Sequence, residues 1–304
     1  MSYKALLIGC GNIGAGYDFD TDAVLTHAKA YSLDKEFRFT VYDRDEALAA
    51  KVAAKYGVER LGEVSDGQLA QFDIVSICTP TVTHFEYLSR AINLNIPLVI
   101  CEKPVAYDED ELKKIAGIYN SGKTKVLVNY IRRFQPGFIS LKENVKEILA
   151  GERLTNVAIR YQRGFVNNAS HAFDLVGFLA GKEIQLDNIH TKNKVFDAFP
   201  ADPTLTLTAD WQGANFAAVG LSNVKFSLFE IDLYFEYHKI AIREAGNIIE
   251  VYKAEKGDNF FKPLEKKSIQ TNCLQDYMKP VMDAAKRVLA GEQADNFMVG
   301  KPGF

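Results

Sequence analysis

Short apolar segments alternate with helical segments over the first 120 or so residues of the chain. The apolar runs are continuous, which is typical of strands covered on both faces and therefore of a parallel sheet. Strand and helix in alternation predict βαβ units and an open, doubly wound α/β sheet. We expect its strands at residues 4–8, 37–42, 74–78, 97–101 and 125–128.

The intervening helical segments have start and stop signals. Asp45 precedes one of them as a candidate N-cap, and Gly57 follows it as a natural C-terminal stop. Ser65 and Thr83 are each followed three residues later by Gln or Glu, which is the spacing of a capping box. These signals predict helices between the strands.

The pattern changes after a turn-rich break at residues 120–125. One helix is expected at 136–149, and a last long helix at 271–291. Between them lie β-type segments at 154–163, 184–196, 204–211, 215–221, 225–235 and 238–245. Several alternate apolar and polar residues, which indicates a sheet with one face covered and the other at least partly open. We predict an α/β domain at 1–122 and an α+β domain with a large, mainly antiparallel open sheet at 123–304.

Composition narrows the class of protein. The chain has 304 residues, 47% of them hydrophobic, and a net charge of −3, which fits a globular protein of two domains and gives no basic face for nucleic acid. No apolar run approaches the roughly 20 residues that span a bilayer, and the N-terminus lacks a signal-peptide layout. The four cysteines are far apart and have no zinc-ligand spacing. We therefore expect a cytoplasmic protein with no membrane, nucleic-acid or metal partner.

The segment "LLIGCGNIG" places Gly9, Gly11 and Gly14 in G-x-G-x-x-G spacing directly after the first expected strand. The first glycine permits a tight turn, the second lets a pyrophosphate approach bare backbone, and the third lets the helix pack on the strand. A helix N-terminus after the turn adds unpaired N–H groups for the phosphates. This context favours dinucleotide binding over a plain tight turn.

Asp43 ends the second expected strand, where a carboxylate can accept hydrogen bonds from an adenosine ribose. The carboxylate would repel a 2′-phosphate, so we expect NAD as the cofactor. Arg44 could instead clamp that phosphate, which keeps NADP open. The alternative for Asp43 is a turn or helix-capping residue.

The segment after Gly14 resembles an interrupted first helix. Asp18, Asp20 and Asp22 have the spacing of a calcium loop, but Ala23 replaces the needed glycine and Lys29 the bidentate glutamate. We expect a solvated loop over the cofactor edge and no metal site.

"VICEKPVAY" ends a buried strand with Glu102, Lys103 and Pro104. In a doubly wound sheet, ligands bind at the carboxyl ends of the strands, so Lys103 is expected beside the nicotinamide. The proline fixes the backbone, by our interpretation through a cis Lys–Pro bond, and holds the ammonium in place. The alternative is an ordinary surface lysine at a strand end.

These motifs, together with "CTPTVTH", "YIRRFQP" and "NNASHAFD", resemble those of the Gfo/Idh/MocA family (glucose–fructose oxidoreductase, inositol dehydrogenase and rhizopine-catabolism proteins). The resemblance covers about the first 180 residues. It implies a Rossmann domain followed by a sheet domain. The implied activity is an NAD(P)-dependent oxidoreductase of a sugar, sugar derivative or cyclitol.

The resemblance also assigns roles. Lys103 matches the lysine that hydrogen-bonds the reacting hydroxyl, and His171 matches the general base. Asn167 stands where the family's dehydrogenases often have Asp, so it can orient a partner but cannot stabilise an imidazolium by charge. Asp174 matches the usual pattern. We expect the amine of Lys103 and the imidazole of His171 to meet at the nicotinamide from separate domains.

The remaining candidates complete the predicted site. Arg133 is expected to bind substrate, although salt bridges of Arg132 and Arg133 to the first domain are an equal alternative. Asn168 and Asp174 are the other substrate candidates. The predicted cofactor-binding residues are Gly9, Gly11, Asn12, Ile13, Gly14, Asp43, Arg44, Thr79, Pro80, His84, Glu102 and Lys103.

Two other functions stay open at this point. Because of Asn167, the chain could be a catalytically weak or inactive dinucleotide-binding regulator, and a reductase of a non-sugar substrate is a third reading. The outer face of the antiparallel sheet, with apolar and aromatic residues as in "DLYFEY", predicts a homodimer or homotetramer.

Overall fold

The computed structural model describes residues 2–257 and 262–292, so the end of the expected second domain lies outside the described residues. The chain divides into two compact units. Of the described residues, the first unit contains 2–131 and 276–292, and the second contains 132–257 and 262–275. This differs from the expected boundary at residue 122, because a fifth strand and the last helix both pack in the first unit. No helix among the described residues is long and apolar enough to cross a membrane.

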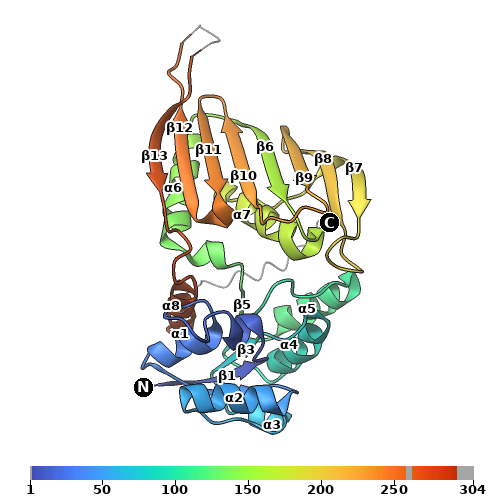
Figure 1. Ribbon diagram of the computed structural model, residues 1–304, viewed down its shortest axis with the longest axis vertical. Helices are drawn as coiled ribbons and strands as arrows, with labels where there is room; N and C mark the ends of the chain where they lie inside the picture. Colours follow the sequence, from blue (N-terminus) through green and yellow to red (C-terminus); the bar gives the residue numbers. More distant parts are fainter. Residues whose placement is uncertain (1, 258–261, 293–304) are drawn as a thin grey trace. The chain divides into compact units, whose positions relative to one another are not determined.

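The first unit is built on a five-stranded parallel sheet with the order β2-β1-β3-β4-β5. Every strand residue of β3 and β4 is buried, which explains their continuously apolar sequence. All five predicted strands are confirmed, with ends that move by no more than one residue. They are β1 (Tyr3–Ile8), β2 (Phe37–Tyr42), β3 (Ile74–Ile77), β4 (Leu98–Cys101) and β5 (Lys125–Val128) (Figure 1).

Helices cover both faces of this sheet. The chain crosses the sheet in one direction from β1 to β2, and in the opposite direction from β2 through β3 and β4 to β5. Because such crossovers are right-handed, α1 lies on one face of the sheet and α2, α4 and α5 lie on the other. The C-terminal helix α8 joins α1: it contacts both α1 and β4, and its apolar residues, such as Met282, are buried. The bounds are α1 (His27–Leu33), α2 (Glu46–Tyr56), α3 (Asp66–Leu69), η2 (Thr81–Thr83), α4 (His84–Asn93), α5 (Glu109–Ser121) and α8 (Met278–Leu289).

Most of the predicted helix signals are confirmed. The carboxylate of Asp45 caps α2, Gly57 ends it with a φ of 66°, and Ser65 forms a capping box with Gln68. Thr83 is a correction: it makes no cap hydrogen bond, because its hydroxyl donates to Pro80 and Thr79 within the turn before α4.

The second unit contains an eight-stranded sheet with the order β13-β12-β11-β10-β6-β9-β8-β7. All neighbouring strands are antiparallel except β6 and β9, which confirms the mainly antiparallel sheet. The strands are β6 (Leu154–Tyr161), β7 (Asp187–Val195), β8 (Thr204–Trp211), β9 (Ala214–Gly220), β10 (Glu230–Phe235), β11 (His238–Arg243), β12 (Ile248–Lys253) and β13 (Glu265–Gln270). The expected strand at 225–235 begins five residues late, and β12 and β13 were not predicted.

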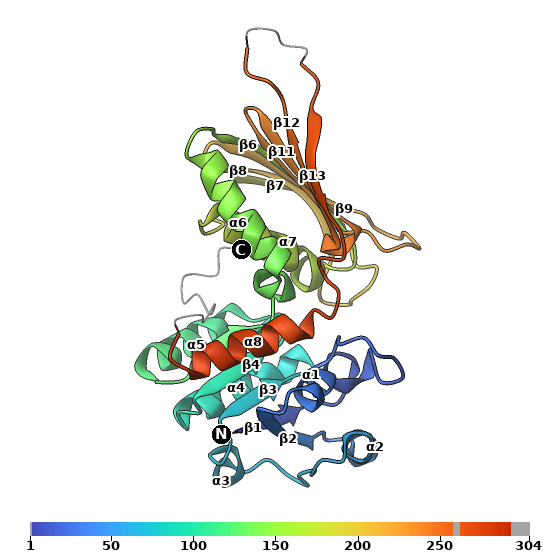
Figure 2. The same cartoon turned by 90° about the vertical axis from the view of Figure 1, so that its left-hand side faces the viewer.

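Helices α6 (Pro136–Leu149) and α7 (Ser170–Ala180) lie against one face of this sheet (Figure 2). The core of the unit forms between them, around large buried side chains such as Trp211, Phe173 and Phe216. In "DLYFEY", Leu233 and Phe235 belong to this core. The prediction of a strongly apolar outer face is therefore corrected, since the residues that alternate with them are Asp232 and Tyr234. The short turns η3 (Ile131–Phe134) and η5 (Glu244–Gly246) complete the unit.

Candidate active site

The glycine loop joins β1 to a five-residue π-helix, η1 (Asn12–Gly16), which contains Asn12 and Ile13. Gly9 has a φ of +98°, and a Cβ there would lie 2.6 Å from the carbonyl carbon of Cys78. A Cβ on Gly14 would lie 2.0 Å from the carbonyl oxygen of Gly9. A Cβ on Gly11, by contrast, would meet no heavy atom beyond its chain neighbours within 4 Å. Packing thus requires the first and third glycines, whereas the second leaves bare backbone open to a ligand, as a pyrophosphate needs.

Asp43 stands beside this loop at the end of β2. One carboxylate oxygen accepts a hydrogen bond from the backbone N–H of Cys10 at 2.7 Å, and the other from that of Asp45 at 2.9 Å. These bonds fix the carboxylate, and its remaining lone pairs can accept the hydroxyls of a ribose. Arg44 is exposed next to it.

The segment between η1 and α1 is better ordered than expected. Asp18 is fully buried, and its carboxylate accepts hydrogen bonds from the backbone N–H groups of Leu25 (2.6 Å) and Thr26 (2.8 Å) and from the hydroxyl of Thr26 (2.7 Å). The expectation of a wholly solvated loop is therefore wrong for Asp18, which organises the turn that leads into α1. Asp20 and Asp22 are partly or fully exposed.

Two loops at the carboxyl edge of the sheet carry the next candidates. Ile77 of β3 and Cys101 of β4 are register partners, so Thr79 and Lys103, two residues beyond each, lie at the same edge. The Lys103–Pro104 peptide bond is cis, as interpreted from the sequence. Lys103 is partly exposed.

His84 connects these two loops. The imidazole is buried, with Nδ1 2.9 Å from the carbonyl oxygen of Pro104 and Nε2 2.8 Å from that of Thr79. Burial is the main cause that lowers the pKa of His84, and hydrogen bonds to the two carbonyls oppose it. The side chain thus positions the loops that hold Lys103 and Thr79, while Pro80 remains exposed beside them.

Glu102 points into a buried polar network that sequence reasoning missed. One oxygen of its carboxylate accepts a hydrogen bond from Asn129 Nδ2 at 2.6 Å and lies 3.0 Å from His27 Nε2. His27 Nδ1 and the hydroxyl of Tyr31 both contact Ser76 Oγ, at 3.2 and 2.7 Å. A serine inside the apolar run of β3 is the one sequence signal that could have indicated this network. Through these contacts Glu102 anchors the loop that carries Lys103 to the buried network.

His27, Cys78 and Glu102 also offer ligand atoms within 4.8 Å of one another. Hydrogen bonds already account for the positions of His27 and Glu102. Burial, followed by the charge of Glu102, raises the pKa of the Cys78 thiol well above its ordinary value, which opposes the thiolate that a metal requires. We assign no metal to this cluster.

The candidate base lies in the second unit. A π-helical turn, η4 (Phe165–Ala169), leads into α7, and His171 is partly exposed in the first turn of α7. The side-chain amide of Asn168 donates to the carbonyl of Gln162 at 2.7 Å, and that of Asn167 to the carbonyl of Arg163 at 3.4 Å. Both asparagines thus stabilise the turn locally.

Asp202 holds this turn in place and was not predicted. Its side chain is buried, and its two carboxylate oxygens accept hydrogen bonds from the backbone N–H groups of Val166 (2.8 Å) and Asn167 (2.7 Å). A Cβ on Gly164 would lie 2.2 Å from Asp202 Oδ2, which explains the glycine with its φ of +87°. Asp202 thus brings a carboxylate to the backbone of Asn167 from a different segment of the chain.

Arg133 and Asp174 bind each other. The Nε of Arg133 lies 2.8 Å from both carboxylate oxygens of Asp174. Burial raises the pKa of Asp174, and the charge of Arg133 opposes that shift. Arg132 is buried over the ring of Phe229 and donates to the carbonyl of Ala245. These contacts lie within the second unit, so they do not support the alternative of salt bridges to the first domain.

Comparison with known proteins bears on the first unit directly. Residues 3–130 match the model of the oxidoreductase family with an NAD-binding Rossmann fold, GFO_IDH_MocA. Over these residues the chain is similar to the Gfo/Idh/MocA family. The resemblance expected from the motifs is confirmed.

Individual relatives are similar over part of their length. An inositol 2-dehydrogenase of Rhizobium meliloti is 28% identical over 197 residues, which are 60% of this chain and 56% of the relative. A UDP-N-acetylglucosamine 3-dehydrogenase of Acidithiobacillus ferrooxidans is 29% identical over 151 residues, 49% of this chain and 44% of the relative. The matched segments thus span about half of these proteins.

Similarity of fold extends further. The solved structure of the UDP-N-acetylglucosamine 3-dehydrogenase from Acidithiobacillus ferrooxidans superposes with a TM-score of 0.73, over 95% of this chain and 88% of that one. The sequence identity in this comparison is 18%, so it establishes the fold of both units and nothing finer.

Proposed function

We propose that this protein is an NAD-dependent dehydrogenase or reductase of a hydroxyl or ketone carbon on a sugar, sugar derivative or cyclitol. The observation that carries the proposal is the glycine loop, in which packing requires Gly9 and Gly14 while Gly11 leaves open backbone for a pyrophosphate. The dehydrogenase names of the relatives support the reaction type and the substrate class.

The choice of NAD rests on Asp43. A fixed carboxylate at the end of β2 suits the ribose hydroxyls of NAD and repels the 2′-phosphate of NADP. The neighbouring Arg44 is the only feature at this strand end that favours NADP. When bound, the nicotinamide cofactor supplies the acceptor or the donor of hydride.

In this proposal the chain's own residues manage the proton and the charge. His171 accepts the proton of the substrate hydroxyl in oxidation and returns it in reduction. The ammonium of Lys103 donates a hydrogen bond to the same oxygen and stabilises its developing negative charge. Asn167 orients the histidine or the substrate, and Arg133 and Asp174 contribute to substrate binding as a joined pair. Thr79 lies at the same sheet edge as Lys103, and Asn168 lies in the turn that precedes His171.

A second function has one observation in its favour. Asn167 cannot ionise, so the acid–histidine pairing expected of the family's dehydrogenases is missing at this position. A dinucleotide-binding regulator with weak or absent turnover is the alternative that follows. A reductase of a non-sugar substrate would share the same proton-handling residues.

The test combines binding and turnover. NADH and NADPH fluorescence titrations measure cofactor preference, and a panel that includes myo-inositol and UDP-N-acetylglucosamine measures activity with each cofactor. We expect tighter NADH binding, and turnover that falls at least about a hundredfold in Lys103→Ala and His171→Ala, the range for loss of one proton-transfer or oxyanion group. Lys114→Ala, at an exposed position on α5, is the matched control.

The outcomes separate the readings. Binding of NADH without turnover of any panel member supports the regulator. Turnover that is unchanged in Lys103→Ala contradicts the proposed mechanism. Absence of binding by either nucleotide contradicts both functions.

A further inference from the structure

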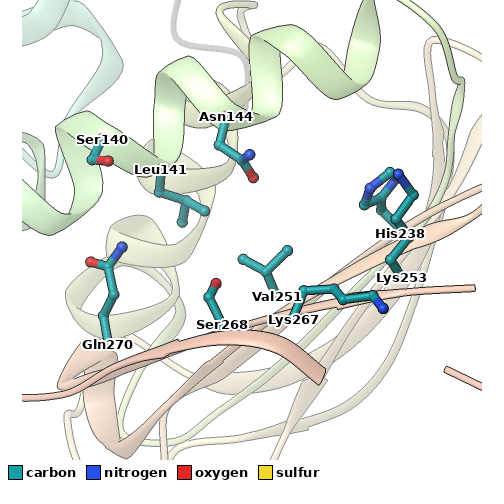
Figure 3. Close-up of a pocket in the computed structure, with 9 residues that line it drawn as sticks. All are labelled: Ser140, Leu141, Asn144, His238, Val251, Lys253, Lys267, Ser268 and Gln270. Carbon is teal, nitrogen blue, oxygen red and sulfur yellow. The ribbon is translucent and has the colours of Figure 1, made fainter. Parts of the chain in front are cut away.

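A cavity of about 300 Å³ lies in the second unit between α6 and the edge of the large sheet. Figure 3 shows its two sides: Ser140, Leu141 and Asn144 extend from the helix, and His238, Lys253 and Lys267 extend from the strands. The volume is that of a small-molecule site. None of the candidate cofactor or catalytic residues lines this cavity.

The charged side chains that line the cavity, Lys253 and Lys267, are both basic. Two lysines and a histidine line it, and no carboxylate does. Lys267 pairs with Glu265 at 2.5 Å, but both side chains are about half exposed, so this pair is weak and can rearrange. Lys253 has no ion-pair partner among the described residues. In Figure 3 the end of the Lys267 side chain points toward the side of the cavity where His238 and Lys253 lie.

The imidazole of His238 is held in one orientation. Its Nδ1 lies 2.7 Å from a carboxylate oxygen of Glu152, whose other oxygen accepts the backbone N–H of Tyr237 at 2.9 Å. Glu152 is buried, so this support is shielded from solvent. A carboxylate at Nδ1 fixes the proton there and leaves Nε2 as an acceptor for a ligand hydroxyl in the cavity.

Asn144 supplies an independent observation. Its side-chain oxygen is buried and has no hydrogen-bond partner, although the residue lines the cavity. A buried polar atom without a partner is costly, and a bound molecule with hydroxyl groups would satisfy it. The hydroxyls of Ser140 and Ser268 and the amide of Gln270 add further hydrogen-bonding groups around the same space.

We propose that this cavity binds a small anion that also carries hydroxyl groups, such as a polyol phosphate or a sugar acid. The anionic group lies toward Lys253 and Lys267, and the hydroxyls lie toward Nε2 of His238, Asn144 and the two serines. This is a second small-molecule site, and it is independent of the proposed oxidoreductase function.

Histidine NMR tests the proposal without any assay of activity. The chain has 5 histidines, so the ring Cε1–H signal of His238 can be assigned from the spectrum of a His238→Gln variant. Glycerol 3-phosphate, gluconate, inorganic phosphate and glycerol are titrated separately. We expect saturable shifts of the His238 signal with glycerol 3-phosphate or gluconate, weaker binding of phosphate, and none of glycerol.

Variants locate the binding. Lys253→Gln removes one charge-assisted contact at an exposed position and is expected to weaken binding about five- to tenfold. Asn144→Leu is expected to weaken the binding of glycerol 3-phosphate and gluconate but not that of inorganic phosphate. Lys146→Gln, exposed on the same helix but outside the cavity, is the matched control and should bind as the wild type does.

Each result decides the question. A response to glycerol 3-phosphate alone identifies a phosphate ligand, and a response to gluconate alone identifies a carboxylate. The proposal is overturned if neither anion shifts the His238 signal, or if Lys253→Gln and Lys146→Gln bind equally well.

Discussion

His84 shows how a single buried side chain connects a titratable group to the candidate site. Its ring joins the carbonyls of Thr79 and Pro104, and burial lowers its pKa below the ordinary value near 6.5. A ring that carries one proton donates to only one of these carbonyls. The two carbonyls favour the charged ring, but burial disfavours it more, so the folded protein favours the neutral imidazole.

A dependence of stability on pH follows. Below about pH 6.5 the unfolded chain binds a proton at His84 that the folded chain does not, so this contribution to the free energy of unfolding is lost as pH falls toward the lowered pKa. Urea unfolding of the wild type and of His84→Gln should differ most near pH 8 and least near pH 5. A difference that grows on acidification would contradict the lowered pKa.

Asp202 is the second residue with a specific expected effect. Asp202→Ala removes the acceptor of two backbone N–H groups at the start of η4, which we expect to cost about 2–4 kcal/mol of stability. Asp202→Asn retains one acceptor and should cost less. Hydrogen exchange of residues 165–171 should accelerate in the alanine variant. Asp210→Ala, at an exposed position on β8, is the control and should leave these amides unchanged.

The sequence predicted the residues whose role is local and failed for those whose role depends on distant segments. Gly9, Gly11 and Gly14 could be interpreted because their roles follow from one turn. Asp202 is 35 residues from the N–H group of Asn167 that it binds. His27 is 75 residues from Glu102. No local pattern contains such pairs, so only the fold reveals them.

At the scale of elements, two of the segments that carry predicted functional residues contain a π-helical turn. η1 follows the glycine loop, and η4 precedes the helix of His171. π-turns are rare and are often found at functional sites. An α-helical spacing argument places residues 167, 171 and 174 on one face, but the wider turn of η4 shifts Asn167 relative to the other two. The sequence pattern contains no signal for this change.

The missed strands have a physical explanation. Every residue of β13 is exposed, and its sequence "EKKSIQ" contains three charged residues. Charged edge strands are typical of sheets that avoid edge-to-edge pairing, and they lack the apolar alternation used to find strands. Composition therefore gave no signal for β13, whereas β7 at the opposite edge was predicted although almost all of its residues are exposed.

Helix α8, in the last described part of the chain, contributes to the stability of the first unit. Met282 is 2% exposed, and α8 contacts α1 and β4. We expect Met282→Ala to destabilise this unit by about 2–4 kcal/mol, through lost burial and a cavity. Hydrogen exchange should accelerate in α1 and β4 but not in β6 or β10. Arg287→Ala, half exposed on the same helix, should have no such effect.

At the scale of the whole molecule, the large sheet has one face that no described helix covers. Its centre carries a network of charges instead of an apolar patch: Asp232 is 3% exposed and pairs with Arg160, Lys239 and Arg243. The ring of Tyr234 lies under the ammonium of Lys239. Arginine and tyrosine are enriched at protein interfaces, and a self-complementary mixture of both charges suits a two-fold contact.

The size of this face supports an oligomer. Eight strands about 4.8 Å apart and about six residues long form a face of roughly 800 Å², close to what each partner of a stable complex buries. We propose that two copies of the chain associate through it. Light scattering at micromolar concentration should then give a dimer or tetramer, and Tyr234→Glu, which adds an unpaired acid at the centre, should shift the protein toward monomer. Tyr107→Glu, at an exposed position in the first unit, is the control and should keep the wild-type mass. A wild type that is monomeric, or a Tyr234→Glu variant that keeps its mass while its circular dichroism is unchanged, would exclude this face as the interface.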